Sequence, residues 1–126
     1  MARPQRSRRV CDMPQVRRFV PSPSPFPAGS AAEEPIILTV DEFEALRLVD
    51  HEGLTHSQCA VQMNISRTTA TEICESARRK VAEAIVCGKK LVIRGGSWEL
   101  CEGSRHNCIK SSCFRSDPPA DPAGRG

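Results

Sequence analysis

The chain has 126 residues and a formal net charge of +3, with four Phe, one Trp and no Tyr. This length suits one small domain with tails, and its core must be built mainly from aliphatic side chains. No run of about 18 apolar residues is present, which excludes a transmembrane helix, and the basic N-terminus lacks the apolar stretch of a secretory signal. We therefore expect a cytoplasmic protein whose seven cysteines are thiols or metal ligands rather than disulfides.

The charge is unevenly distributed along the chain. Residues 1–32 hold six Arg and one Asp, whereas residues 33–100 hold eight Lys or Arg and eleven Asp or Glu. A basic arm on an acidic core suggests a polyanion partner, although a solvated arm without a partner would have the same composition. The sequence predicts a basic arm with a Pro-rich linker over residues 1–35, a folded domain over 36–100, and a largely disordered, Cys-containing tail over 101–126.

The first predicted elements are short strands and one helix. Strands are expected at Val10 and at Ile36–Leu38. Thr39 and Glu42 then match the capping box that opens a helix. This helix should end near Gly53, because glycine readily adopts the left-handed conformation that terminates helices.

Two further helices are predicted on either side of a short turn. The capping box at Thr55–Gln58 opens a short helix, and Asn64 suits a turn position with positive φ. Ser66 should cap a long helix over Arg67–Cys87, whose apolar residues recur every 3.6 positions. Gly88 should end that helix.

The segment after the long helix has the pattern of a β-hairpin. Leu91–Ile93 and Trp98–Leu100 are β-prone and flank a Gly95-Gly96 pair, a common hairpin turn. The predicted fold class is therefore mainly α, a helix-turn-helix with a small C-terminal β-hairpin that could act as a wing.

The helix-turn-helix prediction is based on spacing. Ala60 is small where a second helix would cross closely, and Asn64 lies in the turn four residues later. Ala70 and Ile73 are then placed to face the core, which leaves the N-terminal residues of the long helix polar and free to enter a major groove.

The predicted contacts with DNA fall into three groups. Arg67 can donate two hydrogen bonds to guanine, threonine methyl groups can contact thymine, and Glu72 can accept from cytosine. The helix start can bind a phosphate, and basic residues later on the helix or on the arm can contact the backbone. The predicted DNA-binding residues are Ser66, Arg67, Thr68, Thr69, Thr71, Glu72, Arg78, Arg79, Arg3, Arg6, Arg8 and Arg9.

These features resemble a known group of proteins. The chain is similar to an uncharacterised bacterial and archaeal family of small predicted DNA-binding proteins, with a helix-turn-helix like that of sigma-factor region four. The resemblance implies transcription regulation with no established target. The chain departs from the family in one respect: some relatives have an additional Cys near Ser7 that would pair with Cys11, and its absence here weakens an N-terminal metal site. The segments that carry the resemblance are MARP at the start, RRVC at Arg8–Cys11, and the stretches Leu38–Leu54, Ser66–Ile85 and Gly88–Gly96.

Several cysteines could bind a metal ion. The C-terminal cysteines have the spacing C-x6-C-x4-C with a histidine between them, and an N-terminal cysteine could complete a zinc site. The looseness of this spacing leaves incidental thiols in a tail as the alternative. Cys59 and Cys74 are expected in the core. The candidate zinc ligands are Cys11, Cys101, His106, Cys108 and Cys113.

No catalytic constellation is present, so the sequence favours a protein that is not an enzyme. The expected partner is double-stranded DNA, with a homodimer or the transcription machinery as further possibilities. Two alternatives remain open. One is a metal- or redox-responsive sensor that acts through DNA binding. The other is a protein-interaction module that uses the acidic residues Asp41, Glu42 and Glu44.

Overall fold

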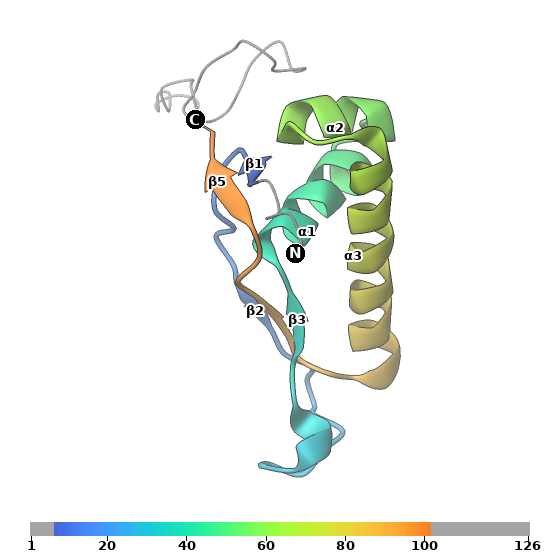
Figure 1. The fold of residues 1–126 in the computed structure, drawn as a ribbon. Helices are drawn as coiled ribbons and strands as arrows, with labels where there is room; N and C mark the ends of the chain where they lie inside the picture. Colours follow the sequence, from blue (N-terminus) through green and yellow to red (C-terminus); the bar gives the residue numbers. More distant parts are fainter. Residues whose placement is uncertain (1–6, 102–126) are drawn as a thin grey trace, which may run out of the picture.

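The computed structural model describes residues 7–101, where three α-helices lie against two small β-sheets. Helix α3 runs along one side of the molecule and the strands along the other, with α1 between them and α2 across one end of α3 (Figure 1). In this part of the chain, no helix combines the length and the apolar character needed to cross a membrane. In chain order the elements are β1 (Arg8–Val10), β2 (Arg18–Phe19), the 3-10 turn η1 (Ala31–Glu33), β3 (Ile36–Leu38), α1 (Val40–Leu46), the π-helical turn η2 (Arg47–His51), α2 (His56–Met63), α3 (Arg67–Cys87), β4 (Leu91–Ile93) and β5 (Trp98–Leu100).

Both predicted capping boxes are confirmed. The side chain of Thr39 accepts from the backbone N–H of Glu42, and the Glu42 carboxylate accepts from the backbone N–H of Thr39. Thr55 and Gln58 exchange the same two bonds at the start of α2. Each pair satisfies two backbone donors that have no partner inside the helix, which fixes where α1 and α2 begin.

The predicted turn between α2 and α3 is also confirmed. Asn64 has φ 61° and ends α2 in the left-handed region, and Ser66 caps α3 by accepting from the N–H of Thr69. At the far end, Gly88 has φ 66°. Three local signals therefore set the limits of the two helices.

The predicted β-hairpin is wrong. Strand β4 pairs with β2 in antiparallel fashion and with β3 in parallel fashion, so both of its edges are occupied. Strand β5 instead pairs in parallel with β1, at the other end of the described chain. The strands on either side of Gly95-Gly96 therefore belong to different sheets, and the wing that a hairpin could have formed is absent from residues 88–101.

The two glycines have a packing role instead. The N–H of Val40 donates to the carbonyl of Gly95 at 3.0 Å. Gly96 has φ 94°, and a Cβ there would collide with the side chains of Asp41 and Thr39. The Gly-Gly pair thus lets this loop lie directly on the start of α1, which the sequence pattern alone does not distinguish from a hairpin turn.

Part of the predicted arm belongs to the folded unit. Strands β1 and β2 come from residues 1–35, yet they pair with β5 and β4 respectively. Val10 is fully buried. From residue 7 onward, the segment expected as arm and linker therefore contributes two strands and part of the core.

The core consists of two clusters of buried apolar side chains. The first lies between α1, α2 and the N-terminal half of α3, and the second lies between the sheets, α1 and the C-terminal half of α3. The first contains Ala45, Leu48, Cys59, Ala60, Met63, Ala70, Ile73 and Cys74, and the second contains Val10, Leu38, Val40, Ala77, Ala84, Leu91 and Ile93.

Candidate functional site

The N-terminal half of α3 has one buried face and one exposed face. Ala70 and Ile73 lie in the first core cluster, as the spacing predicted. On the opposite side, exposed residues follow one another at intervals of three or four, which places them on one line along the helix. We call this line the outer stripe, and its residues are Thr68, Glu72, Glu75 and Arg79.

Several predicted site residues gather at the start of α3. Arg67 is exposed in the first turn, beside the outer stripe. The Ser66 hydroxyl caps the helix and also donates to the Thr69 hydroxyl at 2.9 Å. Thr71 bonds to His56 Nδ1 at 2.9 Å, so its hydroxyl is used to hold α2 against α3. Among the predicted base-reading residues, Arg67, Thr68 and Glu72 have exposed side chains.

The two predicted phosphate contacts on α3 differ in their surroundings. Arg79 is exposed on the outer stripe. Arg78 donates to both carboxylate oxygens of Asp50, at 2.7 and 3.0 Å, from a side chain that is half exposed. An exposed ion pair of this kind contributes little to stability. A phosphate could therefore replace Asp50 as the partner of Arg78.

The arm arginines that the structure describes have intramolecular contacts, and their predicted contacts with the DNA backbone stay a prediction. Arg8 forms an ion pair with Asp41 at 3.6 Å, and both side chains are nearly buried. Arg9 donates to the carbonyls of Val61 and Gln62 at the end of α2, where a cation complements the helix dipole. Both are held in place because β1 pairs with β5. Arg3 and Arg6 lie outside the described residues.

One exposed residue on the outer stripe was not predicted. Glu75 lies between Glu72 and Arg79 on the same side of α3. Its position seven residues after Thr68 would have identified it, since residues spaced by seven share a helix face.

A buried polar network holds the supporting elements together. The Glu44 carboxylate is fully buried and accepts from the Arg47 guanidinium through two bonds of 2.9 Å. It also accepts from the backbone N–H of Cys11 at 3.0 Å. Gln62 Nε2 donates to Cys11 Sγ at 3.4 Å. Burial alone would lower the pKa of Arg47, but its bonds to Glu44 raise that pKa, so the guanidinium stays charged.

The acidic residues of α1 do not form the exposed surface that a protein-interaction module would use. Asp41, Glu42 and Glu44 are all buried. Glu42 accepts from Lys80 at 2.8 Å and from the Ser76 hydroxyl. Burial would raise the pKa of Glu42, but these bonds and the one from Thr39 lower it below its ordinary value. These carboxylates serve to attach α1 to α3 and β1.

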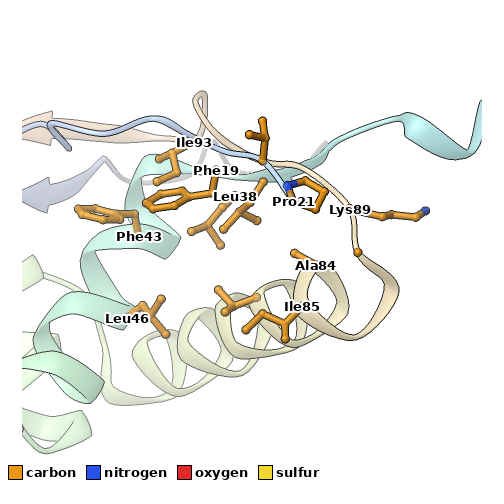
Figure 2. Close-up of a pocket in the computed structure, with 13 residues that line it drawn as sticks. Phe19, Pro21, Leu38, Phe43, Leu46, Ala84, Ile85, Lys89 and Ile93 are labelled. Carbon is orange, nitrogen blue, oxygen red and sulfur yellow. The ribbon is translucent and has the colours of Figure 1, made fainter. Parts of the chain in front are cut away.

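An apolar hollow of about 440 Å³ lies beside the C-terminal half of α3. Figure 2 shows Phe19 and Leu38 on the strand side of the hollow and Ala84 and Ile85 on the α3 side. Lys89 is the charged residue in its lining, and its ammonium group points away from the hollow. Around the hollow, large apolar side chains are more than half exposed. We call them the apolar rim, which consists of Phe19, Val20, Ile85 and Val86.

The cysteines fall into three groups. Cys59 and Cys74 are fully buried core residues, as predicted. Cys87 is exposed at the end of α3. Cys11 and Cys101 are both buried and follow the paired strands β1 and β5. Within residues 7–101, no three His, Cys, Asp or Glu side chains are grouped so that they could hold a metal ion. The other predicted ligands, His106, Cys108 and Cys113, lie outside the described residues.

Comparison with known proteins places the chain in a family. Residues 1–101 match the family described as "Protein of unknown function DUF134", and the chain belongs to this family. It is 42% identical over 115 residues to a UPF0251 protein of Desulfitobacterium hafniense strain Y51, which covers 91% of this chain and 88% of that protein.

Relatives occur in both bacteria and archaea, which confirms the family that the sequence resembles, while its sigma-factor-like helix-turn-helix stays a prediction. A UPF0251 protein of Chlorobium chlorochromatii is 48% identical over 123 residues, 92% of this chain and 66% of the relative. One from Pyrococcus abyssi is 48% identical over 81 residues, 64% of this chain and 71% of the relative. No solved structure matches the chain.

Proposed function

We propose that the protein binds double-stranded DNA in a sequence-specific manner and regulates transcription, with the N-terminal half of α3 in the major groove. The observation that carries this proposal is the division of that half-helix between core and solvent. Ala70 and Ile73 are buried against α1 and α2, while Arg67, Thr68 and Glu72 are exposed. A helix-turn-helix needs such a recognition helix, fixed from behind and polar in front.

The turn between the two helices supports the same proposal. Ala60 is buried in the first cluster, and Asn64 has the positive φ that a tight turn requires. The N–H of Ile65 donates to the carbonyl of Ala60 at 2.9 Å. This bond and the turn at Asn64 fix the direction in which α3 leaves α2. A fixed direction is necessary for base contacts to keep their register.

The charges on α3 suggest how affinity and specificity are divided. The outer stripe has two carboxylates, Glu72 and Glu75, and one cation, Arg79. A carboxylate repels phosphate but can accept a hydrogen bond from the amino group of cytosine. Arg79, and Arg78 after release from Asp50, are placed to contact phosphates. Specificity would therefore come from the first turns of α3 and part of the affinity from these two arginines.

The proposal is tested by selection from a random DNA library, followed by binding measurements with variants. Selection at about 150 mM salt, near physiological ionic strength, should enrich one motif. Arg67→Ala should then weaken binding to that motif by about 1–3 kcal/mol and relax the preference at one base pair. Glu83→Ala is the matched control, because Glu83 is exposed on the same helix but four turns further on.

Two results would contradict the proposal. One is a library that yields no motif, with binding that disappears as salt rises, because this is the behaviour of nonspecific charge attraction. The other is an Arg67→Ala variant whose affinity and base preference equal those of the control.

We infer that two copies of the chain pair through the apolar rim. A small molecule could fill the hollow, but it would leave the outward side of Ile85 and Val86, which are 76% and 81% exposed, in water. A second copy would cover both, because each copy offers protruding side chains next to a hollow of its own. Such a self-complementary surface suits a twofold dimer, and it would leave the outer stripe of each copy free to read half of a palindrome.

Light scattering coupled to size exclusion tests this pairing. The wild-type chain should have the mass of a dimer, and Ile85→Glu should have that of a monomer, since a carboxylate in the interface has no partner. Val61→Glu introduces the same charge at another exposed apolar residue, on α2 away from the apolar rim, and should remain dimeric. A wild-type monomer at all concentrations would exclude the pairing and leave DNA reading by a single copy.

A further inference from the structure

Three sulfur atoms lie together in the first core cluster, where α2 packs against α3. The Cys59 thiol donates to Sδ of Met63 at 3.7 Å, one turn later on α2. It also hydrogen-bonds to the thiol of Cys74 on α3. All three side chains are fully buried. The core therefore contains a compact group of two thiols and one thioether, to which both helices contribute.

The spacing of these sulfurs suits one metal ion bound between them. A metal–sulfur bond is about 2.3 Å long, so a flat three-coordinate ion holds its sulfur atoms about 4.0 Å apart. The sulfurs of Cys59 and Met63 are already 3.7 Å apart. An ion would displace the thiol hydrogen bonds within the group and the bond of 3.9 Å from Cys74 to the carbonyl of Ala45. Because thiols are weak donors, these bonds cost little to lose.

The types of ligand favour monovalent copper. Thiolate and thioether sulfur select soft ions such as Cu(I), whereas zinc is bound by Cys, His and carboxylate ligands and is four-coordinate in structural sites. A zinc ion at the three sulfurs would need a fourth ligand from water, which full burial excludes. Within residues 7–101, no three His, Cys, Asp or Glu side chains form a metal-binding group, so the thioether of Met63 is the additional ligand that makes a site here.

Packing alone does not explain why sulfur occupies these positions. Cys and Met can serve as ordinary core residues, since Cys behaves as a small apolar side chain and Met fills irregular gaps. Ala, Val or Leu would satisfy the same need for volume. The convergence of three sulfur atoms from two helices is instead the arrangement that a soft metal ion requires.

A nearby arginine can compensate the charge of the metal-bound group. Two thiolates and one Cu(I) ion together carry one negative charge, and a buried charge is costly without a partner. Arg78 follows Cys74 by one turn of α3, so the two side chains lie on the same side of the helix, and they interact electrostatically. The guanidinium of Arg78 is therefore placed to offset this charge.

We propose that Cys59, Met63 and Cys74 bind one Cu(I) ion. Each thiol loses its proton to water as its sulfur–copper bond forms, and the thioether donates a lone pair without a change of charge. Because the sulfurs are buried, the ion enters during folding or when α2 opens locally. Bound copper would join α2 to α3. This proposal does not depend on DNA binding, since it concerns the packed faces of the two helices and not their exposed faces.

Copper analysis of the full, reduced chain tests the proposal. The chain is exposed to excess Cu(I) without oxygen, freed of unbound copper by gel filtration, and analysed for copper per chain. Cys59→Ala and Cys74→Ala should each retain one copper ion fewer than the wild type, whatever the remaining cysteines bind. Cys87→Ala is the matched control, because Cys87 is exposed at the end of α3 and lies outside the group.

X-ray absorption at the selenium edge covers the case in which the cysteine variants fail to fold. In selenomethionine-labelled protein saturated with Cu(I), selenium should have a copper neighbour at bonding distance. Labelled Met63→Leu conserves the core volume and keeps Met13, and its selenium should have no copper neighbour.

Three results would overturn the proposal. The first is a wild-type chain that retains no copper after gel filtration. The second is copper retention by folded Cys59→Ala and Cys74→Ala that equals that of the wild type. The third is the absence of a copper neighbour at selenium in the saturated wild-type protein, or an equal copper signal in Met63→Leu.

Discussion

Along α3, the side chains of the N-terminal half divide sharply between core and solvent, whereas those of the C-terminal half do not. In the first half, Ala70 and Cys74 are fully buried and the outer stripe is polar. In the second half, Ala84 is buried but Ile85 and Val86 are exposed. A single continuous helix thus has a polar exposed surface at one end and an apolar exposed surface at the other.

This difference indicates that the two halves of α3 are suited to different kinds of partner. A polar surface on a rigidly packed helix can form directional hydrogen bonds with base edges. An apolar surface beside a hollow gains free energy when another apolar surface covers it. The proposed function assigns DNA to the first end and a second copy of the chain to the second, so the two contacts do not compete for the same residues.

The largest effect is expected at the buried ion pair between Arg47 and Glu44, in the network that supports the N-terminal half of α3. Arg47→Met should lower the free energy of unfolding by about 3–5 kcal/mol, because the buried Glu44 carboxylate would lose its cation. Arg94 is exposed after β4, and Arg94→Met should change the free energy by less than about 0.5 kcal/mol. Urea denaturation measures both, and equal losses would show that the network does not support the fold.

A second test compares the packing of the two ends directly. Leu48 is fully buried in the first cluster, so Leu48→Ala should cost about 2–5 kcal/mol. Ile85 is mostly exposed, so Ile85→Ala should change the stability of the monomer by less than about 0.5 kcal/mol. These values should be measured by urea denaturation at low protein concentration, where pairing does not contribute. A large loss for Ile85→Ala under these conditions would mean that the hollow is part of the core.

A third test concerns the turn between α2 and α3, which orients the N-terminal half of α3. Asn64 has φ 61°, and an alanine there should cost about 1 kcal/mol because its Cβ opposes the left-handed conformation. Asn64→Gly should stay within about 0.5 kcal/mol of wild type, since glycine adopts positive φ freely. If alanine and glycine were equally tolerated by thermal unfolding, the backbone at this turn would not be constrained.

The smallest expected effect is a pH dependence of the free energy of unfolding, caused by Glu42, which contacts the middle of α3. The pKa of Glu42 is lowered from its ordinary value of 4.5 by bonds from Lys80 and Ser76 that outweigh burial. The folded state therefore holds this proton less tightly than the unfolded state, so the stabilisation is present above pH 4.5 and is lost as the pH falls through the lowered pKa.

The variant Glu42→Gln should accordingly differ most from wild type at neutral pH, and the difference should shrink below pH 4.5. Glu99→Gln, at an exposed position on β5, serves as the control. Urea denaturation across this pH range provides the comparison, and a difference that stays constant with pH would contradict the assignment.

The sequence was sufficient to predict the helices because their signals are local. Thr39, Thr55 and Ser66 each act on backbone groups within three residues, and Asn64 determines its own turn. The strand pairing depends instead on residues far apart, and no local pattern connects Arg8 to Trp98. The Gly95-Gly96 pair illustrates the limit, since a hairpin turn and a close approach to α1 both require glycine.

The candidate site was predictable to a similar extent. The buried positions in the N-terminal half of α3 followed from the 3.6-residue period, whereas Ile85 fits the same period and is exposed. The roles of Arg8 and Arg9 could not be predicted, because their partners Asp41 and the end of α2 are brought to them only by the tertiary fold. Composition identified a basic segment, but it could not distinguish arginines that bind the protein itself from arginines available to a partner.

The parallel pairing of β1 with β5 has a consequence for how the chain acquires its structure during synthesis. The first and last strands of the described fold form one ladder, so this ladder cannot close until residue 100 has left the ribosome. By then α1, α2 and α3 have already emerged, and their mostly local contacts form faster than contacts between distant segments. The helices can therefore assemble first, and the N-terminal strand must wait in the nascent chain until the last strand arrives to pair with it.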